Sequence, residues 1–267
     1  MLLFAVPPVA YPHADDSATR PLRVVALVPA RFDSSRLPGK ALADLAGRPM
    51  IEHVWRRAAA ARGVGAVIVA TDDVRIVEAV ERSGGRARLT SPAHRSGTDR
   101  IAEVAASLDC DVVVNVQGDE PLLDPDAIDA ILAPFADPDV RMTTACVRLT
   151  DPDEAADPHV VKVVVDTHGD ALYFSRAPIP YDRVGPDAPR AACYKHLGLY
   201  AYRRDFLLAI ARLPRTPLEH AESLEQLRVL EHGFRIRTVE TSHDSVGVDT
   251  PADLERVRRQ LLAAVRT

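Results

Sequence analysis

The sequence predicts an α/β fold in which a Rossmann-like, mostly parallel sheet is flanked by helices and carries a smaller mixed β extension. Three nearly continuous apolar runs, at residues 22–28, 66–70 and 111–116, are typical of parallel strands covered on both faces. A segment with helical periodicity follows each run after a polar loop. Beyond about residue 140 the pattern changes to alternating strands, which indicates the extension.

The remaining elements follow from apolar spacing and from start and stop signals. A helix is expected to begin at Pro49 and to end before Gly63, because its apolar residues recur every three or four positions. Thr216, Pro217 and Glu219 form a strong helix start for a single helix that runs to Gly233. The other expected elements are helices at 74–83, 101–108, 125–135 and from 250 onward, and strands at 142–149, 160–165, 172–174, 197–202 and 234–239.

Length and charge limit the class of protein. A chain of 267 residues buries roughly three quarters of its unfolded surface, enough for one large domain, which we expect at residues 22–267. The formal net charge of -5 argues against a nucleic-acid partner, for which a clustered basic face is expected. An anionic substrate must therefore be attracted by local cations.

The cysteines and the ends of the chain indicate a cytoplasmic protein. Cys110, Cys146 and Cys193 are odd in number and lack CxxC spacing, which favours a reducing compartment. No apolar run approaches the ~18 residues of a membrane span, so no membrane partner is expected. Residues 1–21 lack the basic start and cleavage site of a signal peptide and are expected to be a disordered tail or the result of an upstream start codon.

The loop at residues 28–40 carries three cations, Arg31, Arg36 and Lys40, directly after the first strand. Ligands of open α/β sheets bind outside the carboxyl ends of the strands, so these side chains are expected over the ligand crevice. The chain has three lysines against thirty arginines, so Lys40 indicates a position that favours a compact charge for phosphate. The alternative is a solvated connection, since the loop is rich in Ser, Arg, Pro and Gly.

Two further loops are expected at the same edge of the sheet. Thr71 and Asp72 follow the second strand, and Ser96 and Gly97 precede a helix. Helix capping alone would explain these residue types. The open amide groups at a helix start, next to a glycine, also suit an anion or the edge of a base.

The third strand ends in a turn that can hold a metal. Asp119 follows Gly118 in this turn, which aims a carboxylate away from the strand end. Beside a cationic phosphate loop, Asp119 is a candidate Mg²⁺ ligand, because this metal binds through one or two carboxylates plus substrate phosphates. Asp249, before the last helix, is by itself only a turn residue.

The later part of the chain gives weaker signals on its own. His196 and Tyr200 are four residues apart, so they share one face of a strand, although a lone strand histidine is more often structural. Glu222, Glu225 and Gln226 occupy the polar side of the helix expected at 216–233, where a solvated face is the simpler interpretation.

Several segments taken together resemble the 3-deoxy-D-manno-octulosonate (Kdo) cytidylyltransferase family, within the sugar nucleotidyltransferase superfamily. The cationic loop occurs widely among sugar nucleotidyltransferases, whereas the segment at 115–121, together with those at 173–176 and 196–198, is much narrower in its occurrence and points to the Kdo enzymes. The resemblance extends from about Leu22 to the C-terminus. The segments that carry it are residues 28–40, 71–72, 96–98, 115–121, 171–176, 196–200, 217–219, 224–228 and 247–251.

The resemblance implies that CMP is transferred from CTP to the anomeric hydroxyl of Kdo, with release of pyrophosphate, in lipopolysaccharide biosynthesis. It implies that Arg31 and Lys40 hold the triphosphate and that Asp119 and Asp249 bind Mg²⁺. The implied nucleotide contacts are Ala30, Arg31, Arg36, Lys40, Thr71, Asp72, Ser96 and Gly97. The implied sugar contacts are Gln117, Arg176, His196, Tyr200, Glu222, Glu225 and Gln226.

The resemblance also implies a homodimer joined through the mixed β region at about 140–215. Two departures from the family pattern, a Pro- and Arg-rich segment at 181–193 and Lys195 in place of an expected Arg, lie outside the motif residues. Two alternatives remain: a cytidylyltransferase for another acidic sugar, such as sialic acid or an amino-substituted Kdo, and a non-catalytic nucleotide-binding protein.

Overall fold

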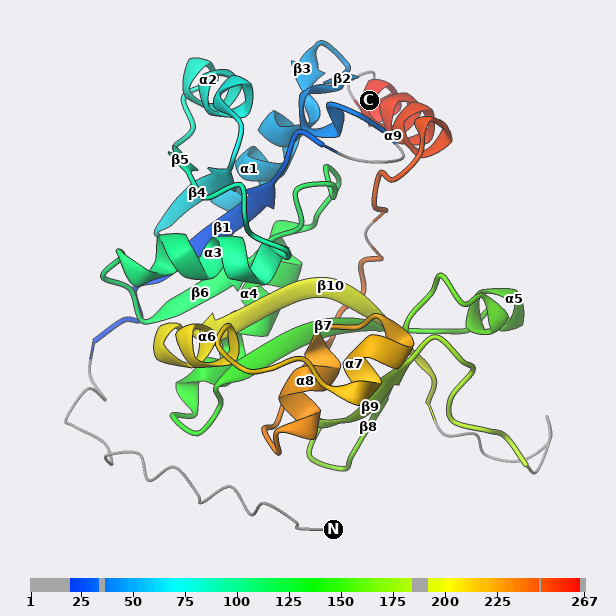
Figure 1. Ribbon diagram of the computed structural model, residues 1–267. Helices are drawn as coiled ribbons and strands as arrows, with labels where there is room; N and C mark the ends of the chain where they lie inside the picture. The colour runs from blue at the N-terminus through cyan, green and yellow to red at the C-terminus, as the bar shows by residue number, and fades with distance from the viewer. Residues whose placement is uncertain (1–19, 34–36, 184–191, 245, 265–267) are drawn as a thin grey trace.

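The computed structural model describes residues 20–33, 37–183, 192–244 and 246–264 (Figure 1). Residues 1–19 of the tail expected at 1–21 lie outside the described residues. Arg36 also lies outside them. None of the helices in the described ranges has both the length and the apolar character needed to cross a bilayer.

A large mixed sheet forms the centre of the described chain, with strand order β11-β7-β10-β6-β1-β4-β5 and with β8 and β9 attached beside β10. β1 is parallel to β4 and β6, and β4 is parallel to β5, whereas β10 runs antiparallel to both β6 and β7. A separate hairpin joins β2 and β3. The strands are β1 (Val24–Ala30), β2 (Asp44–Leu45), β3 (Arg48–Pro49), β4 (Ala66–Thr71), β5 (Ala87–Leu89), β6 (Val112–Asn115), β7 (Met142–Arg148), β8 (Lys162–Val165), β9 (Ala171–Ser175), β10 (Tyr194–Arg203) and β11 (Arg237–Glu240).

Helices cover both faces of this sheet, which is why its strands are apolar on both sides. In β1, Ala26 and Val28 pack in the cluster that contains the apolar faces of α1, α2 and α4, whereas Leu27 packs in the cluster that contains α3, α6 and α8. The predicted α/β fold class is thus confirmed. The helices are α1 (Met50–Ala60), α2 (Val74–Arg82), α3 (Gly97–Ala106), α4 (Pro125–Leu132), α5 (Pro152–Ala156), α6 (Arg204–Ile210), α7 (Pro217–Glu222), α8 (Gln226–Glu231) and α9 (Pro251–Ala264), with short 3-10 helices η1 (Lys40–Leu42) and η2 (Ala133–Ala136).

The single helix predicted for residues 216–233 is wrong, because the structure divides it into α7 and α8. The chain turns at Ser223, whose φ of 53° lies in the left-handed region. Thr216 and Glu219 form the predicted capping box, but the Glu219 carboxylate also accepts two hydrogen bonds from Arg228, which folds α8 back against α7. Leu218, in the first turn of α7, is 39% exposed, so α7 does not turn this apolar residue to the core.

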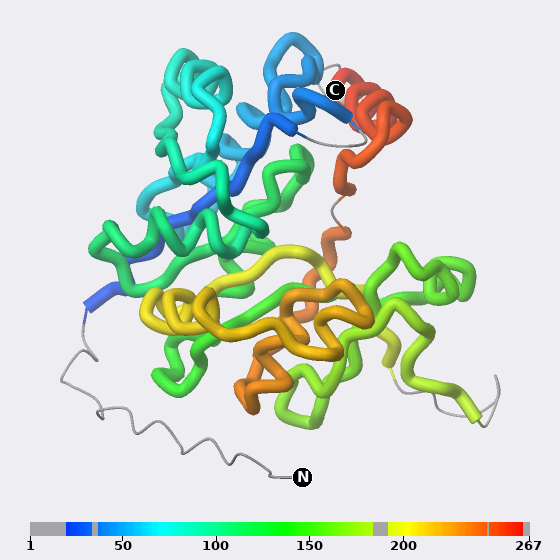
Figure 2. The backbone as a smooth tube through the Cα atoms, viewed as in Figure 1, coloured from blue at the N-terminus to red at the C-terminus, as the bar shows by residue number. Residues whose placement is uncertain are grey.

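The C-terminal helix α9 lies at the opposite end of the molecule from β11, the strand that precedes it in the sequence. Figures 1 and 2 show the chain leaving β11 near α7 and α8 and running up to α9, which lies beside the β2–β3 hairpin. Val257 of α9 is fully buried against Leu45 of β2 and Val248. Arg258 also donates a hydrogen bond of 2.7 Å to the carbonyl of Asp44. These contacts fix the segment that carries Asp249.

Candidate active site

A cavity of about 360 Å³ opens at the carboxyl ends of β1 and β6. Its walls come from the loop after β1, the start of α3, the turn after β6 and the segment before α9. Among the predicted residues, the lining contains Ala30, Arg31, Lys40, Ser96, Gly97, Gln117, Asp119 and Asp249. The edge of the sheet predicted to bind a ligand is therefore hollow, and its lining carries four cations when Arg95 and Arg100 are included.

Lys40 joins the two carboxylates that the sequence proposes as metal ligands. Its Nζ donates to Asp119 Oδ2 at 2.7 Å and to Asp249 Oδ1 at 3.2 Å. The backbone supports this arrangement, because the amide of Val248 donates to the carbonyl of Asp119 at 2.8 Å. Residues far apart in the sequence are thus brought to one position at the rim of the cavity.

The turn after β6 requires glycine. A Cβ at Gly118 would lie 2.6 Å from the carbonyl oxygen of Pro29, a backbone atom of β1 that cannot move away easily. The close approach of Gly118 to β1 sets where Asp119 and Gln117 project.

At the start of α3, Ser96 accepts a hydrogen bond from the amide of Asp99 at 3.1 Å, so the predicted cap is present.

Two predicted nucleotide contacts, Thr71 and Asp72, lie outside the lining of this cavity. Thr71 is fully buried, and its hydroxyl accepts from the amide of Asp73 at 3.2 Å. Asp72 accepts a hydrogen bond of 2.7 Å from Arg100, which also donates to Thr90. Neither Thr71 nor Asp72 belongs to the lining, whereas Arg100 does. In this structure Asp72 holds the buried Arg100 in the cavity wall.

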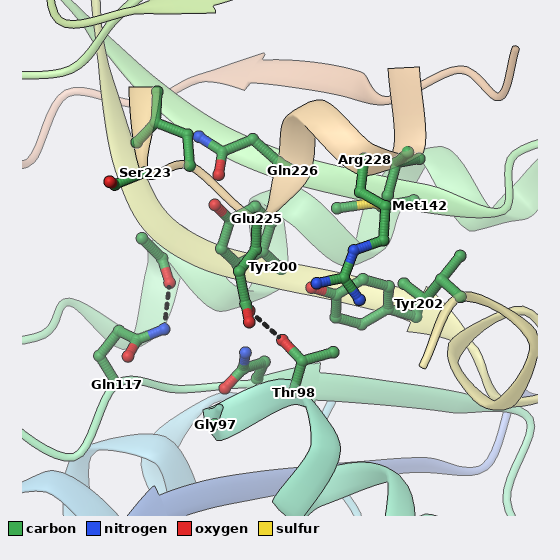
Figure 3. Close-up of a pocket in the computed structure, with 15 residues that line it drawn as sticks. Gly97, Thr98, Gln117, Met142, Tyr200, Tyr202, Ser223, Glu225, Gln226 and Arg228 are labelled. Atoms are coloured by element: carbon green, nitrogen blue, oxygen red, sulfur yellow. Dashed lines mark hydrogen bonds between the residues drawn. The ribbon is translucent and has the colours of Figure 1, made fainter. Parts of the chain in front are cut away.

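A second cavity, of about 230 Å³, adjoins the first and shares Gly97 and Gln117 with it. Figure 3 shows Gln226 and Arg228 entering from the α8 side, with Thr98 and Gln117 on the opposite side. Gln117 donates to the carbonyl of Gly198 at 3.1 Å, which ties it to β10. The predicted sugar contacts in this lining are Gln117, Tyr200, Glu225 and Gln226.

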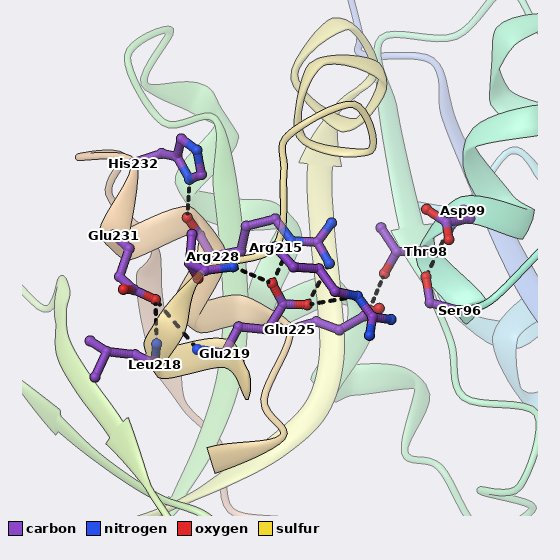
Figure 4. Close-up of polar contacts among 11 residues, drawn as sticks. Ser96, Thr98, Asp99, Arg215, Leu218, Glu219, Glu225, Arg228, Glu231 and His232 are labelled. Carbon is purple, nitrogen blue, oxygen red and sulfur yellow. Dashed lines mark hydrogen bonds and ion pairs between the residues drawn. The ribbon is translucent and has the colours of Figure 1, made fainter. Parts of the chain in front are cut away.

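Glu225 is connected across the cavity to the helix on the other side. Its Oε2 accepts a hydrogen bond of 2.8 Å from the hydroxyl of Thr98 in the first turn of α3. Figure 4 shows this contact beside the pair formed by Arg228 and Glu219. The α3 side and the α8 side of the cavity are therefore linked through two side chains.

Arg176 and Glu222 lie outside the lining of both cavities and support each other instead. Arg176 Nε donates to the carbonyl of Glu222 at 2.8 Å, and one of its terminal nitrogens donates to the carbonyl of Pro158. The Glu222 carboxylate accepts from Ser175 at 2.6 Å and from the amide of Arg176 at 2.9 Å. These bonds attach the end of β9 to the α7 segment.

His196 also lies outside both linings, against Tyr200, which does line the second cavity. The two ring centroids are 5.3 Å apart, so the predicted common face is present despite an irregular register of β10 between the two residues. The Thr144 hydroxyl lies 2.9 Å from His196 Nε2 and 2.9 Å from the carbonyl oxygen of Leu199, so it holds the ring against β7. Desolvation lowers the pKa of His196 to about 3, so the ring is neutral.

The candidate site residues from the sequence leave out several polar residues of the two linings, among them Arg95, Thr98, Arg100, Asn115 and Arg228. Arg95 and Thr98 flank the Ser96 and Gly97 pair that was selected, so extending that motif by one residue each way would have found them. Asn115 opens the specific segment at 115–121. Arg228 ends the segment at 224–228, but its place at the cavity depends on the break between α7 and α8, which the sequence pattern does not show.

Comparison with known proteins assigns the chain to one family. A family model described as "Cytidylyltransferase" matches residues 25–237. The 3-deoxy-manno-octulosonate cytidylyltransferase of Geobacter metallireducens is 55% identical over 249 residues, covering 90% of this chain and 98% of that protein. The corresponding protein of Geobacter sulfurreducens is 54% identical, with coverage of 90% and 100%.

A solved structure supports the same family. The structure of a CMP:2-keto-3-deoxy-manno-octonic acid synthetase in complex with CTP superposes with a TM-score of 0.86 at 48% identity, covering 91% of this chain and 99% of that one. The family model and this superposition define a nucleotidyltransferase of the cytidylyltransferase class. Within this class, the chain belongs to the 3-deoxy-manno-octulosonate cytidylyltransferase family.

Proposed function

We propose that the protein transfers CMP from CTP to the anomeric hydroxyl of Kdo, releasing pyrophosphate, and that the two adjoining cavities hold the two substrates. The observation that carries this arrangement is that the cavities share Gly97 and Gln117, so ligands in them meet. Because the attacking hydroxyl and the α-phosphorus must align, the protein contributes orientation and charge more than a nucleophile. The reaction would supply the activated sugar for lipopolysaccharide biosynthesis.

The nucleotide cavity contains the groups that a triphosphate requires. Arg31, Lys40 and Arg95 supply positive charge, and the amides at the start of α3 can donate to a phosphate or to the base. Arg36 belongs to the same loop and is proposed as a further cation, although it lies outside the described residues. These groups would neutralise the leaving pyrophosphate.

The carboxylates of Asp119 and Asp249 fit a divalent cation. They already share one cation, the ammonium of Lys40. The described residues contain no cluster of three or more His, Cys, Asp or Glu side chains suited to a metal, so the protein itself would supply two ligands and the substrate would supply the others. Two carboxylates completed by substrate phosphates are the usual Mg²⁺ environment. When bound, Mg²⁺ would supply charge to the phosphate oxygens and lower the pKa of the attacking hydroxyl.

The second cavity offers a polyhydroxylated acid both donors and acceptors. Gln117, Tyr200, Glu225 and Gln226 are proposed to contact sugar hydroxyls, and Arg228 adds a guanidinium for a carboxylate. We propose an indirect role for three residues that lie behind the lining of the second cavity. Arg176 and Glu222 hold β9 against α7, and His196 packs against Tyr200.

We also propose a cytoplasmic homodimer whose contact is the mixed β region at 140–215. The exposed Leu172 on β9, 62% accessible, is consistent with a covered face in an assembly. Light scattering after size exclusion should give twice the chain mass of 29.0 kDa, and a monomer would contradict the proposal.

The decisive experiment measures pyrophosphate release from CTP and Mg²⁺ with a panel of acidic sugars. Turnover with Kdo is expected. Turnover with sialic acid or an amino-substituted Kdo but none with Kdo would replace the sugar assignment. CTP binding without pyrophosphate release for any sugar would instead support the non-catalytic alternative.

A further inference from the structure

A phenylalanine ring connects the loop after β1 to the first turn of α2. Phe32 directly follows Arg31, and the guanidinium of Arg75 lies over its ring, 3.4 Å from the ring centroid. The carbonyl of Phe32 also accepts a hydrogen bond of 3.0 Å from the amide of Gly39, at the other end of the loop. A Cβ at Gly39 would lie only 3.3 Å from the same ring. Phe32 is therefore in contact with both α2 and Gly39.

Arg75 is fixed in this position by the residue that caps its helix. Asp73 Oδ1 accepts hydrogen bonds from the amide of Arg75 and from its Nε, both at 2.9 Å. The other carboxylate oxygen accepts from Arg75 Nη2 at 2.5 Å, so the planar guanidinium is bound through two of its nitrogens. Asp73 is the N-cap of α2 and comes shortly after β4. The guanidinium is thus oriented by the start of α2 and not by the loop that it contacts.

The residues next to this contact supply positive charge to the nucleotide cavity. Arg31 precedes Phe32, Lys40 follows Gly39, and both cations line the cavity. Arg75 itself lies outside the lining of both cavities. A shift of Phe32 would move the backbone from which Arg31 and Lys40 project. Because small errors in the placement of such groups slow a reaction strongly, a fixed base for this loop favours the chemistry.

We propose that Arg75 is a positioning residue for the nucleotide, which by stacking on Phe32 fixes the backbone that carries Arg31 and Lys40. This inference rests on the proposed function for the identity of the nucleotide cavity and gives a role to a residue outside that cavity. The alternative is a contact that only stabilises the surface, since the side chain of Arg75 is 55% exposed. Exposed ion pairs contribute little to stability, so the two roles predict different results.

Arg75→Met removes the planar cation and keeps most of the length of the side chain. Its dissociation constant for CTP, measured by titration calorimetry with Mg²⁺, should rise about fivefold, because the cation–π contact is lost. The dissociation constant for CMP should change less than about twofold, since CMP lacks two of the phosphates that the loop cations attract. The KM for Kdo should also change less than about twofold, and the melting temperature should fall by less than about 2 °C.

Three further variants test whether the effect passes through the ring. Arg75→Lys keeps a cation near Phe32 and should recover part of the CTP affinity. Phe32→Leu should weaken CTP binding as Arg75→Met does, and the double variant should be no weaker than either single variant, because both remove the same contact. Arg82→Met is the matched control, since Arg82 lies on the same helix, where it donates to the carbonyl of Glu78, and this variant should leave every constant unchanged.

An unchanged CTP affinity in Arg75→Met would overturn the proposal. Equal losses for CTP, CMP and Kdo, with a clear fall in melting temperature, would show that Arg75 only stabilises the fold. Additive losses in the double variant would exclude Phe32 as the route. If the wild-type protein binds CTP but turns over no Kdo, the proposed function fails alone, and the comparison of CTP with CMP still decides the role of Arg75. A wild-type protein that binds no CTP would contradict both.

Discussion

At the scale of single residues, Lys40 places a positive charge between two carboxylates that would otherwise repel each other. Its ammonium lies 2.7 Å from Asp119 and 3.2 Å from Asp249, in the position that a metal ion would share. When nucleotide is absent, lysine and divalent cation therefore compete for the same oxygens. A nucleotide that attracts Lys40 to its phosphates would leave these oxygens to the metal.

This competition predicts that Lys40→Met binds Mn²⁺ more tightly than the wild-type protein when no nucleotide is present, by about tenfold. Electron paramagnetic resonance of free Mn²⁺ measures the affinity without any turnover. Lys40→Arg keeps the charge and should bind Mn²⁺ as the wild type does. The double variant Lys40→Met, Asp119→Asn should not show the higher Mn²⁺ affinity of Lys40→Met, because one of the two carboxylates is gone. Equal Mn²⁺ affinity in the methionine variant and the wild type would refute the idea.

The lowered pKa of His196 predicts how the stability of the protein depends on pH. Its pKa of about 3 in the folded protein lies below the ordinary 6.5, so the unfolded chain takes up a proton that the folded protein excludes. The stabilising effect of the neutral ring is therefore complete above about pH 6.5 and is lost as the pH falls toward about 3. Urea unfolding at about pH 7.5 and about pH 5 should show a larger loss of stability for the wild type than for His196→Gln. Equal losses would mean that His196 does not contribute.

At the scale of elements, α3 and α8 are joined by one hydrogen bond across the second cavity. Thr98 donates to Glu225, whereas Arg228 is already bound to Glu219 through two nitrogens. Thr98 is therefore the group that orients the Glu225 carboxylate, and one bond leaves that carboxylate further acceptor positions for a ligand.

Thr98→Val preserves the shape of the side chain and removes the donor, so the KM for Kdo should rise about tenfold. The KM for CTP should change little, because the amides of Ser96 and Gly97 are unaffected. Thr98→Ser, which keeps the hydroxyl, should recover most of the lost affinity. If serine is as defective as valine, the effect comes from packing and the orienting role fails.

The sequence could predict the sheet better than the connection between α7 and α8. Buried parallel strands are nearly continuous apolar runs, and the rule that ligands bind at carboxyl ends of strands needs no coordinates. The helical spacing of apolar residues continues through Ser223, so it conceals the left-handed residue that ends α7. Arg228 enters the cavity only because of this break, whereas Arg176 pairs with carbonyls that local patterns do not reveal.

At the scale of the whole molecule, α9 ties the far end of the chain to the nucleotide cavity. The segment before α9 carries Asp249, and the packing of Val257 against Leu45 fixes that segment on the β2–β3 hairpin. The nucleotide cavity thus depends on the packing of α9 behind it, in a cluster that includes the lining residue Met50.

Val257→Ala should therefore weaken the metal and nucleotide function, although Val257 itself lines neither cavity. The substitution removes buried apolar surface and costs about 2 kcal/mol, which increases local detachment of α9. The Mg²⁺ concentration needed for half-maximal turnover and the KM for CTP should both rise, while the KM for Kdo stays the same. Leu262→Ala, on the same helix at a position 45% exposed, is the matched control and should leave all three constants unchanged. An equal rise of the KM for Kdo in Val257→Ala would show that α9 stabilises the whole fold and has no particular connection to Asp249.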